Sequence, residues 1–184
     1  MSAHIIDGKA LALSLREDIA HAVSALVEET GVRPGLAAVL VGDDPASAVY
    51  VRNKKIACEK AGLYPQEHVL PASTTQEALL ALIQQLNANS KIHGILVQLP
   101  LPPHIESKAI LQAVSSDKDV DGFHPINVGR LVEGDPVFVP CTPKGVIHMI
   151  DSTGLDIAGK RAVVIGRSNI VGKPVAMLLL HRHA

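Results

Sequence analysis

The segment 163–174 constrains this chain most, because it joins an apolar β-branched run to a polar loop bounded by glycines. The opening Val-Val-Ile is typical of a buried parallel strand. Gly166 and Gly172 bound the loop, where small residues let backbone N–H groups approach a phosphate, and Pro174 lies where a helix should begin. The segment therefore predicts a strand over residues 160–165, then a phosphate-binding turn for a dinucleotide, then a helix.

Strand-like and helix-like segments alternate along the rest of the chain. Apolar residues at three- and four-residue steps predict helices, and short β-branched runs predict strands. The expected helices cover residues 8–31, 46–61, 74–86, 106–114 and 142–154, and the expected strands cover 36–41, 69–70 and 94–99. This alternation indicates an α/β fold with parallel sheets and right-handed crossovers.

Two helix starts carry local signals. Thr74 with Glu77 three residues later forms a capping-box pattern, and Thr142 before Pro143 places a hydroxyl cap ahead of a proline at the first helical position. Between residues 120 and 140, Gly, Pro and Asp concentrate and helical periodicity is lost. We therefore expect a domain boundary there.

Composition excludes several classes of function. With 17 Lys+Arg against 18 Asp+Glu, the net charge is -1, and aromatic residues make up 2% of the chain. Neither a nucleic-acid interface nor an anionic-membrane surface is indicated. We find no signal peptide and no run of 18 apolar residues, so we expect a cytoplasmic protein.

Cysteine and histidine spacing indicates neither a disulfide framework nor a metal site. Cys58 and Cys141 lie far apart and match no metal or redox spacing, so we expect two small buried thiols in a reducing compartment. None of the nine histidines pairs convincingly with another at metal-ligand spacing. We predict that the protein binds no metal.

Tyr50 and Lys54 are candidate site residues because they lie four positions apart in an expected helix. Their side chains share one helix face, where a lysine beside a phenol could polarise a carbonyl, stabilise an oxyanion or exchange a proton. The same spacing is equally typical of a solvated face.

Gln98 and Asp121 are further candidates. Gln98 interrupts an apolar strand just before Pro100, which places the amide at the strand's carboxyl end, where ligands of open α/β sheets collect. Asp121 lies in a polar loop and could accept two N–H bonds from a heterocycle. Taken singly, a structural amide and a loop cap explain these two residues as well.

Together, five segments in order closely resemble the bifunctional methylenetetrahydrofolate dehydrogenase/methenyltetrahydrofolate cyclohydrolase family of bacterial type. The resemblance covers essentially the whole chain. The segments are Tyr50–Lys54, Gly94–Pro102, Lys118–Gly122, Pro140–Gly145 and Gly166–Pro174.

This resemblance implies a two-domain α/β architecture. We expect a three-layer folate-binding catalytic domain over residues 1–120, a linker region over 121–140, and the first part of a Rossmann-like NADP-binding domain over 141–184. It also implies tetrahydrofolate derivatives as substrates in one-carbon metabolism, NADP as cofactor, and a homodimer.

The resemblance also implies roles for individual residues. Lys54 matches the family's catalytic lysine, which is implicated chiefly in the cyclohydrolase step. Tyr50 matches the tyrosine that helps to place the folate, and Gln98 the glutamine that orients the lysine. Asp121 corresponds to the aspartate that hydrogen-bonds the pterin.

For the cofactor, Gly166, Arg167, Ser168 and Gly172 form the matching segment. It lacks the three-glycine dinucleotide fingerprint. Arg167 could meet the 2′-phosphate of NADP through its guanidinium fork, and Ser168 could donate a hydroxyl hydrogen bond. An arginine solvating a turn is the alternative from chemistry alone.

Family members continue for roughly a hundred residues beyond the match to Ala184. We therefore expect a C-terminally truncated chain in which NADP binding and hydride transfer are weakened. Two alternatives remain at this point: a catalytically impaired folate-binding or dimerisation fragment, and another two-domain NADP dehydrogenase of the shikimate or amino-acid type.

Overall fold

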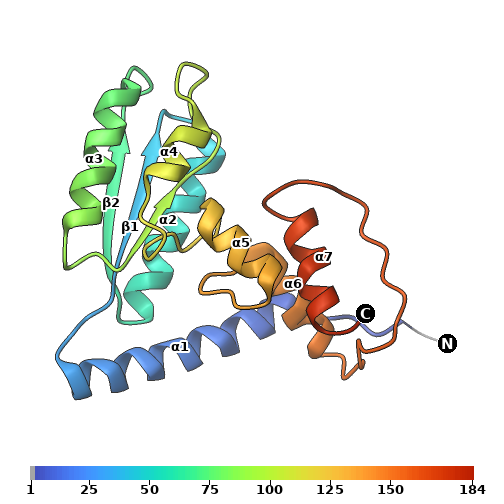
Figure 1. The fold of residues 1–184 in the computed structure, drawn as a ribbon. Helices are drawn as coiled ribbons and strands as arrows, with labels where there is room; N and C mark the ends of the chain where they lie inside the picture. The colour runs from blue at the N-terminus through green and yellow to red at the C-terminus, as the bar shows by residue number, and fades with distance from the viewer. Residues whose placement is uncertain (1–2) are drawn as a thin grey trace. The chain divides into compact units, whose positions relative to one another are not determined.

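A computed structural model describes residues 3–184 and divides the chain into two compact units. One unit contains residues 15–119, and the other contains the residues up to 14 together with 120–184. Helix α1 (Gly8–Thr30) contributes to both units. Figure 1 labels the helices and strands and colours the chain from its N-terminus to its C-terminus.

The unit of residues 15–119 is built on a three-stranded parallel sheet. Its strands are β1 (Gly35–Val41), β2 (Tyr64–Leu70) and β3 (Gly94–Val97), in the order β2-β1-β3. Gly35 is in register with Tyr64, and Leu36 with Gly94. This sheet confirms the expected parallel α/β organisation, although β2 begins five residues before the predicted Val69.

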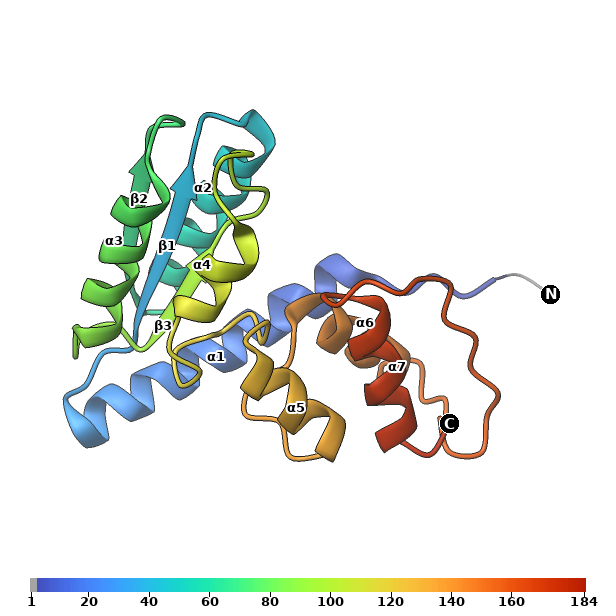
Figure 2. The ribbon, with the colours of Figure 1, turned by 45° about the horizontal axis from the view of Figure 1, so that its top comes forward.

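Helices cover both faces of this sheet, as Figures 1 and 2 show. Helix α2 (Pro45–Lys60) lies on one face, while α3 (Gln76–Ala88) and α4 (Ser107–Ala113) lie on the other. Two β-α-β connections join the parallel strands: α2 connects β1 to β2, and α3 connects β2 to β3. The unit therefore has the three layers predicted from the sequence.

Alternate residues of β1 pack into different layers, because successive strand side chains point to opposite faces. Ala38 and Leu40 pack with Val51 of α2. On the opposite face, side chains of the strands pack with those of α3 and α4 to form the larger core. Its most buried members are Ala37, Val39, Leu79, Ile83, Ile92, Ile95 and Ile110.

Helix α3 begins one residue later than the predicted capping box. The Thr75 hydroxyl caps it by accepting the Ala78 N–H at 3.2 Å. The Thr74 hydroxyl instead donates to the Pro71 carbonyl at 2.7 Å and closes the preceding turn. The prediction of a Thr74 cap was therefore wrong, because the turn uses the first of two adjacent threonines.

The second unit contains a helix that the sequence analysis missed. Helix α5 (Pro125–Glu133) lies within residues 121–140, where we expected no helix. Its start has Pro125 at the first helical position, and the His124 ring accepts the Ile126 N–H at 3.2 Å. Gly134 ends it with a left-handed φ of 87°. These are ordinary helix boundary signals, so the stretch in which we expected helical periodicity to be lost contains a helix.

Helix α6 (Cys141–Asp151) also starts differently from the prediction. Pro140 is the residue before the helix, and no side chain caps it, so Thr142 lies inside the first turn instead of capping it. Cys141 is exposed and Cys58 only half-buried, which corrects the expectation of two buried thiols.

Residues 160–165 form no strand, contrary to the prediction. Val163 is 79% exposed and Ile165 is 99% exposed. A strand needs a hydrogen-bonded neighbour, and no segment among residues 3–184 pairs with this one. After it, α7 (Gly172–His181) begins where the sequence predicted a helix.

Among residues 3–184, no helix is both long enough and apolar enough to span a lipid bilayer.

Candidate functional site

Lys54 and Gln98 meet at the carboxyl end of the sheet in the first unit. The Lys54 ammonium donates to Gln98 Oε1 at 3.1 Å. Gln98 follows directly after β3, its Nε2 donates to the Leu99 carbonyl at 2.8 Å, and its backbone N–H donates to Val39 at 2.8 Å. The amide that interrupts the apolar strand is thus satisfied by a lysine on a different element.

The start of α2 fixes where Lys54 lies. Asp44 caps the helix by accepting the Ser47 N–H at 2.8 Å, and Pro45 occupies its first turn. Hydrogen bonds from the side chain and backbone of Ser47 lower the pKa of Asp44, so the cap stays ionised near neutral pH. One turn before Lys54, Val51 is 1% exposed and anchors the helix on the sheet. Lys54 therefore extends from a helix held at both its end and its middle.

Tyr50 lies one turn before Lys54 and is 63% exposed. Its hydroxyl forms no hydrogen bond with residues 3–184, so the ring is open to solvent beside the lysine. Exposure suits a residue that contacts a ligand and equally suits a surface residue. The role expected for Tyr50 stays a prediction.

Cys58, one turn beyond Lys54, is the other reactive side chain on this face of α2. Burial raises the pKa of the Cys58 thiol, with a smaller contribution from Glu59. A thiol with a raised pKa is neutral at physiological pH and is a poor nucleophile. The chemistry available on this helix is therefore that of Lys54.

Asp121 belongs to the second compact unit, in which it is half-buried. The residues just before it are fastened to β3, because Ile95 donates its N–H to the Lys118 carbonyl at 2.7 Å and forms a bridge with Asp119. The pterin-binding role expected for Asp121 remains a prediction.

Lys118 makes a structural contact that sequence reasoning missed. Its ammonium donates to the carbonyls at the end of α3, those of Leu86 at 3.2 Å, Asn87 at 2.7 Å and Asn89 at 2.9 Å. The negative end of the helix dipole also stabilises a cation beside these carbonyls. Nothing in the local sequence marks this contact, because it joins segments about 30 residues apart.

The loop before α7 folds closely on itself. Ser168 Oγ accepts the N–H groups of Val171 and Gly172, both at 3.1 Å, and the Ser168 carbonyl accepts the Lys173 N–H at 3.0 Å. A Cβ at Gly172 would lie 2.6 Å from the Gly166 carbonyl oxygen. Only glycine therefore fits at position 172 without displacing backbone.

This loop can receive a phosphate. Gly166, Arg167 and Ser168 are exposed and precede a ten-residue helix, whose dipole favours anions near its N-terminus. The N–H groups of Gly172 and Lys173 at that N-terminus are already bonded to Ser168, so an anion would meet the Arg167 and Ser168 side chains. The Ser168 hydroxyl accepts two N–H groups and keeps its own hydrogen for donation. Arg167 adds a guanidinium that can bind an oxyanion through two hydrogen bonds. These residues fit the cofactor phosphates that the sequence predicts.

Two family models match this chain in succession. The catalytic domain of tetrahydrofolate dehydrogenase/cyclohydrolase matches residues 6–121, and the NAD(P)-binding domain of the same enzyme matches residues 140–184. The chain belongs to the tetrahydrofolate dehydrogenase/cyclohydrolase family. This membership excludes the alternative of a shikimate or amino-acid type dehydrogenase.

Curated relatives in the family are similar along almost the whole chain. The bifunctional protein FolD of Magnetococcus marinus is 62% identical over 99% of the chain, and that of Moorella thermoacetica is 59% identical over 100%. The chain spans 64% and 65% of the length of these two proteins.

Solved structures of the family share the fold. The Campylobacter jejuni bifunctional enzyme FolD matches with a TM-score of 0.96 at 47% identity, covering 100% of this chain and 65% of that one. The Trypanosoma brucei enzyme, solved with NADP cofactor and an inhibitor, matches with a TM-score of 0.95 at 41% identity, covering 100% and 63%. These similarities confirm the predicted fold class.

The family domains divide the candidate residues into two groups. Tyr50, Lys54, Gln98 and Asp121 lie within the catalytic-domain match, and the Gly166–Gly172 loop lies within the NAD(P)-binding match. No cluster of three or more His, Cys, Asp or Glu side chains suited to a metal ion occurs in the part of the chain that the structure describes.

Proposed function

We propose that this chain carries the machinery for two consecutive reactions of one-carbon metabolism. The first is NADP-dependent oxidation of 5,10-methylenetetrahydrofolate to 5,10-methenyltetrahydrofolate, and the second is hydrolysis of that product to 10-formyltetrahydrofolate. Membership of the tetrahydrofolate dehydrogenase/cyclohydrolase family supports the proposal. The observation that carries it is the 3.1 Å bond between Lys54 and Gln98 at the carboxyl end of the sheet.

The two reactions make different demands on the protein. When bound, NADP would supply a hydride acceptor for the methylene carbon, and the protein's part in this oxidation would be alignment, with no proton acceptor needed. Arg167, Ser168 and the N-terminus of α7 would hold the cofactor phosphates. Tyr50 and Asp121 would place the folate.

Hydrolysis is the step that needs Lys54. Water attacks the methenyl carbon, loses a proton, and the ring opens as a nitrogen gains one. An ammonium held by the Gln98 oxygen is positioned to stabilise developing negative charge on oxygen and to exchange protons with the reacting groups. Gln98 acts as a positioning residue through its bond to Lys54.

Substituting Lys54 tests this division of labour. In the native protein, Lys54→Met should lower the rate of methenyltetrahydrofolate hydrolysis by about 10² to 10⁴-fold, and NADPH formation by much less. The matched control is Lys55→Met, because Lys55 is its neighbour on α2 and pairs instead with Glu67 at 3.6 Å. Equal losses in both reactions would show that Lys54 only holds the substrate.

A folate-binding or dimerisation module without turnover is the second candidate, favoured by the 99% exposure of Ile165 beside the cofactor loop. An unpaired segment there predicts weak cofactor binding. Folate binding by the 184-residue chain, measured together with NADPH formation, separates the two. Binding without turnover would favour the module, whereas turnover would favour the enzyme.

The family resemblance also supports a homodimer and a cytoplasmic location, which we include in the proposal. Analytical ultracentrifugation of the native protein would test the homodimer, because the mass obtained should be twice that of one chain. Cell fractionation would test the second, because the protein should remain with the soluble cytoplasmic enzymes.

A further inference from the structure

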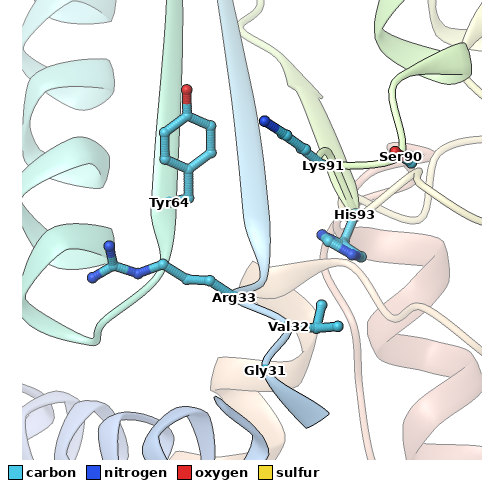
Figure 3. A pocket seen from close by; sticks show the side chains of 7 residues that line it. All are labelled: Gly31, Val32, Arg33, Tyr64, Ser90, Lys91 and His93. Atoms are coloured by element: carbon cyan, nitrogen blue, oxygen red, sulfur yellow. The ribbon is translucent and has the colours of Figure 1, made fainter.

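The two ends of the sheet in the first unit differ in how their side chains are arranged. The hollow at the amino end is lined by Arg33, Lys91 and His93 among other residues. Figure 3 shows these three side chains pointing in different directions from opposite sides of β1, so they do not converge on one ligand. At the carboxyl end, by contrast, hydrogen bonds connect the loops that follow β2 and β3.

Two hydrogen bonds join the loop after β3 to the loop after β2. A carbonyl oxygen only accepts hydrogen bonds, so the His104 Nε2 carries a proton and donates it to the Thr74 carbonyl at 2.8 Å. The Glu106 N–H donates to the side-chain oxygen of Gln76 at 2.7 Å. We call these two bonds the loop tether. Through it, the side chains of His104 and Gln76 connect two segments that lie about 30 residues apart in the chain.

The loop after β2 is itself well fixed. The hydroxyl and the N–H of Thr74 both donate to the Pro71 carbonyl, at 2.7 and 2.9 Å, and Thr75 caps α3. Helix α3 is held on the sheet by Leu79 and Ile83, which are completely buried. The loop tether therefore binds the loop after β3 to a part of the unit that has little freedom to move.

The loop after β3 begins at the candidate site. The Leu99 carbonyl accepts an N–H of the Gln98 side chain at 2.8 Å, and the oxygen of the same amide accepts from Lys54 at 3.1 Å. Three of the four residues between Leu99 and His104 are proline, and each proline ring fixes its own φ torsion. Few free torsions therefore separate the Leu99 carbonyl from the loop tether.

Packing alone does not hold the whole of this loop. Leu101 and Ile105 are buried in the larger core and fix the loop at two points. Pro103 and His104 lie between these two points and are exposed. The loop tether supplies the hold that this exposed part lacks.

We propose that His104 and Gln76 are positioning residues for the hydrolytic step. Through the loop tether they keep the Leu99 carbonyl where it orients the Gln98 amide, and the amide in turn keeps its oxygen toward Lys54. The inference rests on the proposed role of Lys54 in hydrolysis. It extends the site to two side chains that lie outside the five segments resembling the family.

Substitutions that remove one end of each bond test the proposal in the native protein. His104→Leu removes the donor and Gln76→Met removes the acceptor. Each should lower the kcat of methenyltetrahydrofolate hydrolysis about 3- to 10-fold, the order expected for one lost hydrogen bond. NADPH formation should change less than about twofold, because hydride transfer does not use Lys54. Equal losses of both activities would overturn the proposal, because they would indicate a general disturbance of the fold.

Conservative variants and matched controls accompany these substitutions. His104→Gln keeps an N–H donor and Gln76→Glu keeps an acceptor, so both should retain hydrolysis within about twofold of wild type. The controls are His21→Leu on α1 and Gln85→Met on α3, because both residues are exposed and lie outside the loop tether. Neither control should change either reaction. Losses in the conservative variants as large as those in His104→Leu and Gln76→Met would overturn the proposal.

A double-mutant cycle with Lys54 distinguishes positioning from a purely structural role. In a Lys54→Met background, His104→Leu should cause no further loss of hydrolysis, because it acts through the lysine. Additive losses would overturn the proposal. If Lys54→Met lowers hydrolysis selectively while His104→Leu and Gln76→Met leave it unchanged, only the loop tether is refuted. If Lys54→Met has no selective effect, the proposed function of Lys54 fails, and this inference fails with it.

NMR of the Gln98 side chain gives a readout that does not depend on activity. One N–H of its amide is bonded to the Leu99 carbonyl in the structure, so its exchange with water should be slowed. His104→Leu should quicken this exchange, whereas the control His21→Leu should leave it unchanged. Equal exchange in wild type and His104→Leu would show that the loop tether does not hold the amide, which would overturn the proposal.

Discussion

Two apolar segments of this chain differ in whether they form a strand. The run that forms β1 (Gly35–Val41) lies between β2 and β3, and its Val39 is completely buried. The run over residues 163–165 consists entirely of β-branched residues, yet its Ile165 is 99% exposed and unpaired. Side-chain preference is therefore not what makes a strand here. Neighbouring strands and covering helices decide the outcome.

The largest expected effect sharpens this contrast with one substitution in each region. Ile83→Ala removes a fully buried side chain from the α3 face of the sheet core and should lower the free energy of unfolding by about 2 to 5 kcal/mol. Ile165→Ala should change it by less than about 0.5 kcal/mol. Urea unfolding followed by circular dichroism measures both. A comparable loss for Ile165→Ala would show that residues 163–165 are packed in solution.

A second prediction asks whether the loop after the exposed segment is nevertheless rigid. Gly172→Ala should cost about 1 to 3 kcal/mol and weaken phosphate binding at the loop, because its Cβ would meet the Gly166 carbonyl at 2.6 Å. Gly145→Ala in α6 is the control, since nothing lies within 4 Å of its Cβ. It should be neutral or stabilise by about 0.4 to 1 kcal/mol. Tolerance of Ala at position 172 would mean that the loop opens readily.

The third effect concerns the hydrogen bonds from Lys118 to the end of α3 in the first unit. Lys118→Met should cost about 1 to 2 kcal/mol, because the carbonyls at the end of α3 lose a shared cation while the aliphatic stem is kept. Hydrogen exchange at Ile95, whose N–H donates to Lys118, should quicken. The control is Lys60→Met, an exposed lysine in the last turn of α2, which should have little effect on either measurement. Unchanged exchange at Ile95 would show that the Lys118 bonds to α3 do not stabilise this part of the sheet.

The smallest effect is a pH dependence within the sheet itself. Burial lowers the pKa of His68 on β2 below its usual 6.5, and its Nε2 is buried with no hydrogen-bond partner among residues 3–184. Below pH 6.5 the unfolded chain takes up a proton that the folded chain resists, so stability should fall as the pH falls from there. In His68→Leu this contribution should disappear, whereas His21→Leu on exposed α1 should keep it. Parallel stability-against-pH curves for wild type and His68→Leu would contradict the prediction.

Local sequence signals predicted most of the first unit. Helical spacing located α1 and α2, and the polar residue before Pro100 correctly placed Gln98 at the carboxyl end of a strand. The same signals failed where two residues competed for one role, as with Thr74 and Thr75. Cap signals also identify α5 once its loop is not dismissed as a linker.

Contacts between distant segments could not be predicted in this way. The bond from Lys118 to the end of α3 and the ring of His93 against Gly35 each require the folded sheet. Residues 160–165 failed for the reverse reason, since a strand pattern states a preference and not the presence of a neighbour. The pairing of Lys54 with Gln98 was anticipated only through resemblance to a family, because spacing alone left both residues with structural explanations.

The bond between Lys54 and Gln98 also limits how the amide can turn. With its oxygen toward Lys54 and its nitrogen toward the Leu99 carbonyl, the Gln98 amide satisfies both neighbours, while a half-turn would oppose donor to donor and acceptor to acceptor. An ammonium group has three hydrogens, and this amide engages one of them. The other two can bond to a ligand, so a ligand can bind Lys54 without breaking its bond to Gln98.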